Sequence, residues 1–90
     1  MTTKNLTIQN RIGLHSHCAS YFTREANKFK SDIRVLKEGS NPVQAKSLLG
    51  VLSLGITGGV EITVTADGPD EEEAIAALSK LVENGFADAE

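Results

Sequence analysis

Hydrophobic and polar residues alternate in four segments of the chain, with the two-residue period of a β-strand that buries one face. The clearest alternation runs through residues 60–66, Val-Glu-Ile-Thr-Val-Thr-Ala. Shorter alternations occupy residues 6–9, 33–35 and 43–45. Residues 38–42, Glu-Gly-Ser-Asn-Pro, form a turn cluster between the last two segments, which therefore predict a hairpin with a long loop.

Three further segments space their apolar residues three and four positions apart, as an amphipathic helix does. The first helix is predicted to begin at Ser16. The second is short and follows Ser47, whose hydroxyl can cap the amides of its first turn. The third begins after Pro69 with a carboxylate-rich turn and ends at Asn84-Gly85. The predicted apolar positions are Cys18, Phe22, Ala26 and Phe29 in the first helix, Leu48, Leu49, Val51 and Leu52 in the second, and Ile75, Leu78 and Val82 in the third.

The order of these elements is strand, helix, strand, strand, helix, strand, helix. Four strands with one apolar face each need a cover, and the three helices can supply it on the same side. The sequence therefore predicts an α+β fold, an open-faced two-layer sandwich whose four-stranded antiparallel sheet is covered on one face by three helices. With 90 residues, no linker and no internal repeat, residues 1–90 are expected to form a single domain.

Composition and charge narrow the function classes. A net charge of −3 and a pI of about 5.3 without a Lys/Arg cluster argue against direct nucleic-acid binding. No apolar run approaches the roughly 20 residues that span a membrane. A single cysteine cannot form an intramolecular disulfide, so together with the absence of a signal peptide it indicates a cytoplasmic protein. A domain this small rarely encloses a substrate, so a surface site is expected.

The segment 13–18, Gly-Leu-His-Ser-His-Cys, is the most unusual in the chain. If a helix begins at Ser16, His15 lies at its N-terminus, where backbone amides and the helix dipole favour an anion. A neutral imidazole there is a suitable phosphoryl acceptor, with the amides of Ser16, His17 and Cys18 binding the phosphoryl oxygens. The simpler interpretation is that His15 is a loop residue without chemistry.

The same segment offers a set of soft metal ligands in His15, His17 and Cys18. Neighbouring positions on a helix face different directions, and Cys18 falls on the apolar stripe, where an inert thiol is usual. No second ligand cluster accompanies the set. We therefore predict neither a metal nor a cofactor, and we keep a metal- or redox-responsive variant as an alternative.

Ser47 is a second candidate site, because an exposed hydroxyl at a helix N-cap can receive a phosphate. Its plainer role is that of a cap. Leu48, Leu49 and Leu52 cannot all face inward on a short helix, so they predict an apolar docking patch, the alternative being ordinary core. The acidic run 71–73 is better explained as a helix-start signal than as an acid/base pair.

Four segments together resemble HPr, the histidine-containing phosphocarrier family of the bacterial phosphoenolpyruvate:sugar phosphotransferase system. They are Gly13-Leu14-His15 and residues 25–29, 45–56 and 70–78. The resemblance implies that His15 takes a phosphoryl group from Enzyme I on Nδ1 and passes it to sugar-specific transporter components. It also implies that an HPr kinase/phosphorylase modifies Ser47, that the leucines after Ser47 dock partners, and that the serine-phosphorylated form binds a catabolite-control transcription factor. We expect a monomer.

Two departures from the family pattern Gly-Leu-His-Ala-Arg-Pro fall in this segment, where His17 and Cys18 replace the arginine and the proline. His17 becomes the candidate phosphate contact, although one imidazole cannot reproduce the two parallel hydrogen bonds of a guanidinium. Arg11 and Arg24 are candidate substitute cations. The loop at 40–43 is also about one residue longer than the family's. A working phosphocarrier is the favoured hypothesis, ahead of a regulatory paralogue that acts only through Ser47.

Overall fold

The computed structural model describes residues 1–9 and 16–86 of the chain. Its elements follow one another in the predicted order. They are β1 (Thr2–Thr7), α1 (Ser16–Ala26), β2 (Asp32–Lys37), β3 (Val43–Gln44), α2 (Leu48–Ser53), β4 (Glu61–Asp67) and α3 (Glu71–Glu83).

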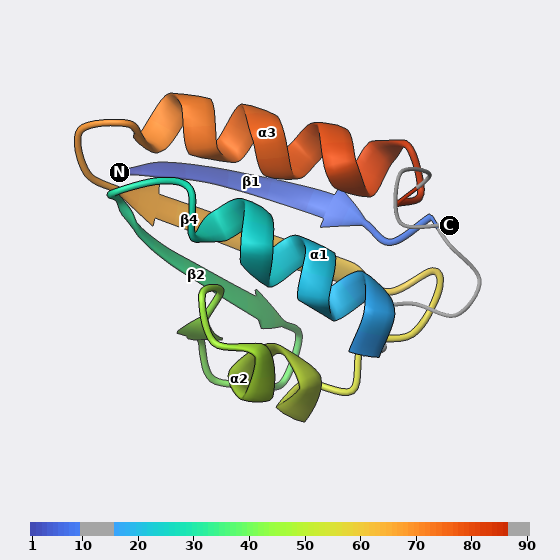
Figure 1. Ribbon diagram of the computed structural model, residues 1–90. Helices are drawn as coiled ribbons and strands as arrows, with labels where there is room; N and C mark the ends of the chain where they lie inside the picture. Colours follow the sequence, from blue (N-terminus) through green and yellow to red (C-terminus); the bar gives the residue numbers. More distant parts are fainter. Residues whose placement is uncertain (10–15, 87–90) are drawn as a thin grey trace.

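The four strands form one antiparallel sheet in the order β1-β4-β2-β3, with all three helices on one of its faces (Figure 1). The central strand β4 pairs with β1 from Thr2↔Ala66 to Thr7↔Glu61, and with β2 on its other side. The predicted hairpin is formed by β2 and β3. The predicted open-faced sandwich is therefore confirmed. Among the described residues, no helix is long and apolar enough to cross a membrane.

The core lies between the sheet and the helices, as the periodicity predicts. The apolar residues of β2 and β4 point toward the helices, where they are buried against the apolar side chains of the helices. The most deeply buried large side chains include Phe22, Ile33, Val35, Val51, Ile62, Val64, Leu78 and Val82. In the predicted stripe of α1, Cys18 and Phe29 are only partly buried. Phe29 lies beyond the last helical residue, so it packs at the margin.

β1 differs from its prediction, since it begins at Thr2 rather than at Leu6. The first half of this strand is polar on both faces, so it carries no alternation signal. Lys4 stands on the helix side of the sheet and reaches Glu83 of α3, with 3.7 Å between Nζ and Oε2. An edge strand tolerates such residues because one of its sides faces solvent.

The C-terminal end of α3 confirms the stop predicted at Asn84-Gly85 and adds a feature to it. Gly85 has a φ of 66°, its amide donates to the Val82 carbonyl, and the Phe86 amide donates to the Leu81 carbonyl. This is the Schellman pattern, in which a left-handed glycine closes a helix. It turns Phe86 inward, where the side chain is fully buried.

Candidate functional site

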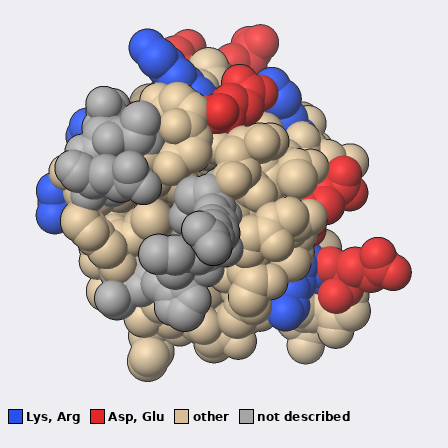
Figure 2. Space-filling model, turned by 90° about the vertical axis from the view of Figure 1, so that its right-hand side faces the viewer, with Lys and Arg blue, Asp and Glu red and all other residues tan. Residues whose placement is uncertain are grey.

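The first turn of α1 is formed by Ser16, His17 and Cys18, as the sequence predicts. Their amides therefore lie at the positive end of the helix dipole. The His17 side chain is exposed, and Cys18 is half-buried against the core. The predicted acceptor His15 and the candidate cation Arg11 lie outside the described residues. Figure 2 views the side of the molecule where α1 begins, and there the described Lys, Arg, Asp and Glu side chains gather toward the edges.

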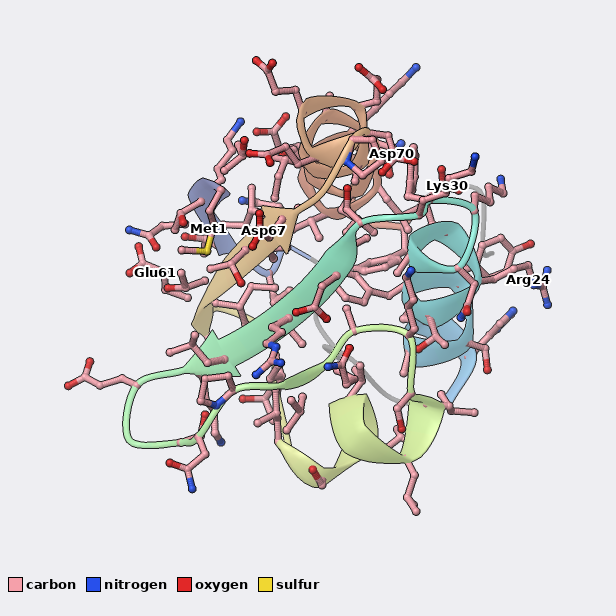
Figure 3. All side chains as sticks on the ribbon, turned by 90° about the vertical axis from the view of Figure 1, so that its left-hand side faces the viewer. Met1, Arg24, Lys30, Glu61, Asp67 and Asp70 are labelled. Carbon is pink, nitrogen blue, oxygen red and sulfur yellow. The ribbon has the colours of Figure 1, made fainter. Side chains whose placement is uncertain are left out.

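Three side chains of α1, those of His17, Tyr21 and Arg24, contact one another in a row that starts in the first turn of the helix. The ring of His17 lies 5.7 Å from the ring of Tyr21, centroid to centroid, with 54° between the planes. The guanidinium carbon of Arg24 lies 5.2 Å from the centre of the same Tyr21 ring. This is a cation–π distance. Arg24 extends outward from the helix in Figure 3.

The row gives Arg24 a contact partner in Tyr21. The sequence had suggested Arg24 as a substitute for the arginine of the family pattern. Arg24 follows Ser16 by eight residues, which corresponds to about 12 Å along a helix axis. Its guanidinium packs on Tyr21. Tyr21 was not singled out from the sequence. The spacing of His17, Tyr21 and Arg24 by four and three positions was the available signal, because such residues are neighbours on a helix surface.

Ser47 is the N-cap of α2, as predicted, with φ −104° and ψ 114°. Its Oγ accepts a hydrogen bond of 3.1 Å from the Gly50 amide, and its carbonyl accepts one of 3.0 Å from the Val51 amide. The residue is nevertheless exposed. The hydroxyl therefore completes the first turn of α2 while facing solvent.

The segment before Ser47 is fastened to the end of α1 by two side chains. Asn27 donates from Nδ2 to the Thr23 carbonyl at 2.9 Å and to the Lys46 carbonyl at 3.1 Å. Lys46 donates from Nζ to the Phe29 carbonyl at 2.7 Å. These bonds fix the backbone that presents Ser47 relative to α1.

The leucines of α2 divide into an exposed pair and a packed one. Leu49 is 79% exposed and Leu48 is 38% exposed, whereas Leu52 is half-buried and packs against the core. Val51 is fully buried and anchors the helix. The predicted apolar patch is thus centred on Leu48 and Leu49, with Leu52 at its inner edge.

The hollows of the described surface lie away from these residues. One of about 190 Å³ lies between α1 and α3 and is lined by Glu25 and Lys80, among others. Another of about 310 Å³ lies at the ends of β2 and β4, beside Leu36 and Glu61. Small-molecule sites usually occupy 300–1,000 Å³ and enclose the ligand. None of the described candidate residues lines either of these two hollows.

Within residues 1–9 and 16–86, no group of three or more His, Cys, Asp or Glu side chains is arranged to hold a metal ion. The ligand set considered from the sequence includes His15, which is not among them. A metal-responsive role for His15, His17 and Cys18 therefore stays an untested prediction.

A four-stranded antiparallel sheet under three helices, with the sequence Gly-Leu-His directly before the first helix, is the arrangement that the resemblance to HPr implied. Comparison with protein families agrees: residues 2–84 match the family described as "PTS HPr component phosphorylation site". The chain belongs to the HPr family of the phosphotransferase system.

Two curated relatives represent two branches of this family. Phosphocarrier protein HPr of Cupriavidus necator is 38% identical over 90 residues, which cover 100% of both chains. HPr-like protein Crh of Bacillus subtilis is 37% identical over 83 residues, which cover 92% of this chain and 96% of Crh. The level of identity does not separate the two branches.

Solved structures give the same fold. HPr-C-His from Thermoanaerobacter tengcongensis superimposes with a TM-score of 0.92 at 43% identity, covering 96% of each chain. An HPr dimer from the same organism gives a TM-score of 0.77 at 42% identity, covering 97% of this chain and 99% of the other.

Proposed function

We propose that this protein is a phosphocarrier that accepts a phosphoryl group from Enzyme I on His15 and passes it to sugar-specific transporter components. The observation that carries the proposal is the position of His15. In a member of the HPr family, it is the residue immediately before α1, whose first turn begins at Ser16. Both partners are proteins, which suits exposed candidate residues such as His17 and Leu49.

The chemistry needs only groups of this chain and its partners. A neutral ring nitrogen of His15 attacks phosphorus, so that a P–N bond forms as the bond from phosphorus to Enzyme I breaks. In the second transfer, a nucleophile of the transporter component attacks the same phosphorus, and the P–N bond to His15 breaks. The amides of Ser16, His17 and Cys18 belong to the first turn of α1, and we propose that they bind the phosphoryl oxygens, as a helix N-terminus can. His17 adds one side-chain N–H donor. No cofactor is required.

Incubation of the protein with phosphoenolpyruvate and Enzyme I tests whether His15 accepts a phosphoryl group. The expected product is an acid-labile adduct, detected by mass spectrometry, that is lost in His15→Ala. His17→Ala is the matched control, since it alters the neighbouring imidazole and keeps the acceptor. If the organism's own Enzyme I gives no adduct, the carrier proposal is wrong.

A second candidate function is regulation through Ser47 alone. It is favoured by the Crh relatives and by the exposed hydroxyl of Ser47. In this case an HPr kinase/phosphorylase modifies Ser47 with ATP, and the product binds a catabolite-control transcription factor. ATP-dependent labelling that is lost in Ser47→Ala, without transfer to His15, supports this function; an unlabelled chain excludes it.

We further propose that the protein acts in the cytoplasm as a monomer. A monomer leaves both the start of α1 and the exposed pair Leu48 and Leu49 available to partners. Solved relatives include an HPr dimer and dimers of Crh, so the oligomeric state of this chain needs a direct measurement. Sedimentation equilibrium at micromolar concentration should give the mass of one chain, and a mass of two chains would contradict it.

A further inference from the structure

Gly50 is the only glycine inside a helix among the described residues. Glycine lowers the stability of a helix relative to alanine, because it loses more backbone freedom on folding. The backbone does not require it here, since Gly50 is absent from the glycines with positive φ. A reason for glycine at this position must therefore be sought in the space beside it.

That space borders Ser47. A Cβ built on Gly50 would lie 3.3 Å from Ser47 Oγ, 3.4 Å from Ser47 Cβ and 3.5 Å from the Gln44 carbonyl oxygen. The distance to Ser47 Oγ is tight for a hydroxyl alone, and the other two are ordinary van der Waals contacts. A phosphoryl group on Oγ would add three oxygens next to this position, because the hydrogen bond of 3.1 Å from the Gly50 amide holds Oγ beside Gly50. A side chain at position 50 would thus press on the atom that a kinase must reach.

We propose that Gly50 provides the room that a phosphoryl group on Ser47 requires, and so determines whether Ser47 can be phosphorylated. This inference rests on the Ser47 part of the proposed function. In the reaction, Ser47 Oγ attacks the γ-phosphorus of ATP, an O–P bond forms, ADP leaves, and the hydroxyl proton passes to a base of the kinase. Gly50 touches no reacting group of ATP; it acts as a specificity determinant through clearance beside Oγ.

A thermodynamic cycle tests the clearance without a kinase. The full chain is made with serine or with phosphoserine at position 47, each with and without Gly50→Ala, and the four melting temperatures are measured. Gly50→Ala should lower the melting temperature of the phosphoserine form by about 4 °C or more relative to its effect on the serine form. Ser53→Ala, which removes the hydrogen bond of 2.6 Å from Ser53 Oγ to the Gly50 carbonyl but adds no atom beside Ser47, should shift both forms equally. Equal shifts by Gly50→Ala overturn the inference.

A kinetic measurement then tests the consequence for the enzyme reaction. With ATP and HPr kinase/phosphorylase, Gly50→Ala should be phosphorylated at least tenfold more slowly than the unaltered chain, whereas Ser53→Ala should match it. A Gly50→Ala chain labelled at the unaltered rate contradicts the inference. If the unaltered chain is not labelled at all, the Ser47 part of the proposed function fails, while the melting temperatures still decide whether Gly50 provides the room.

Discussion

His17 places an imidazole on the exposed first turn of α1, where the family pattern has an arginine. Its ring packs on Tyr21, which in turn carries the guanidinium of Arg24. A guanidinium donates two parallel hydrogen bonds to a phosphate and is always charged, whereas an imidazole directs one N–H to it. At this position the chain therefore has a side chain with one N–H donor to direct at a phosphate, where the family pattern has a guanidinium with two.

Restoring the arginine should accelerate transfer. His17→Arg adds a charge-assisted hydrogen bond to the phosphoryl group, so we expect phosphorylation by Enzyme I to be about tenfold faster. Initial rates at a fixed concentration of Enzyme I measure the effect. Tyr21→Phe keeps the aromatic ring that His17 contacts and should leave the rate unchanged. A rate that stays the same or falls in His17→Arg would show that His17 has a specific role of its own.

Gly68 lies where two loops of the chain approach each other closely. A Cβ at this position would lie 2.7 Å from both Cα and Oγ of Ser31, which is itself buried. Gly68→Ala should therefore destabilise the protein by about 3 kcal/mol, measured by urea unfolding. Gly59 also has a positive φ, of 86°, with nothing within 4 Å of its Cβ position. Gly59→Ala should cost only about 1 kcal/mol of backbone strain, and equal losses in the two variants would argue against the close approach.

At the scale of elements, two carboxylates join the start of α3 to the rest of the fold, and the first of them, Asp70, is labelled near Lys30 in Figure 3. Asp70 accepts from the Ser31 hydroxyl and from the amides of Lys30 and Ser31, at 2.5, 2.8 and 2.9 Å. Glu71 accepts from the Thr2 hydroxyl at 2.6 Å and from the Gly68 amide at 3.2 Å. One residue thus ties α3 to the loop after α1, and the next ties it to the edge strand β1.

These hydrogen bonds make the free energy of unfolding depend on pH. The hydrogen bond from the Ser31 hydroxyl, followed by the one from the Lys30 amide, lowers the pKa of Asp70 below its ordinary value. The hydrogen bond from the Thr2 hydroxyl, followed by the one from the Gly68 amide, lowers the pKa of Glu71 in the same way. Because these pKa values are lower in the folded than in the unfolded chain, their stabilisation is complete above about pH 5 and is lost as the pH falls through the folded values. Urea midpoints measured from pH 6 to pH 2 should fall, and Asp70→Asn should flatten the decline. A decline of the same steepness in Asp70→Asn would assign it to other groups.

The elements that the sequence predicts best are those whose apolar residues recur regularly and those that begin or end at a capping residue. Segment 60–66 alternates cleanly because β4 is central and buries one face, and Ser47 and Gly85 act locally as a cap and a stop. The start of β1 was missed because an edge strand needs no apolar alternation. Phe86 was missed because its burial depends on the left-handed turn at Gly85. The role of the Tyr21 ring depends on side chains that meet only once α1 has formed.

At the scale of the whole molecule, the described candidate residues lie on α1, on α2 and at the N-cap of α2, and these two helices contact each other. The side chains of α2 serve two purposes within two turns: Val51 is fully buried, and Leu49 is 79% exposed. An exposed leucine contributes little to folding, so its apolar surface is available to a partner. The exposed pair Leu48 and Leu49 therefore offers an apolar surface for docking.

Leu49→Asp should weaken docking while leaving the fold intact. We expect the KM for phosphorylation by Enzyme I to rise about tenfold, since burial of one leucine is worth about 1.5 kcal/mol or more. The melting temperature should stay within about 2 °C of the original. Val51→Ala, two positions along, should show the opposite pattern, with a loss of about 2 kcal/mol in stability and an unchanged KM. An unchanged KM in Leu49→Asp would remove this leucine from the docking surface.

The central claim is that the protein carries a phosphoryl group from one partner to another through His15. A reconstituted relay tests it most directly, with phosphoenolpyruvate, Enzyme I, this protein, and a sugar-specific transporter component with its sugar. The account predicts that sugar phosphate forms only when the protein is present, in proportion to its concentration, and that His15→Ala abolishes the product. Sugar phosphate formed equally well by His15→Ala, or none formed by the unaltered chain with its organism's own partners, would contradict the account.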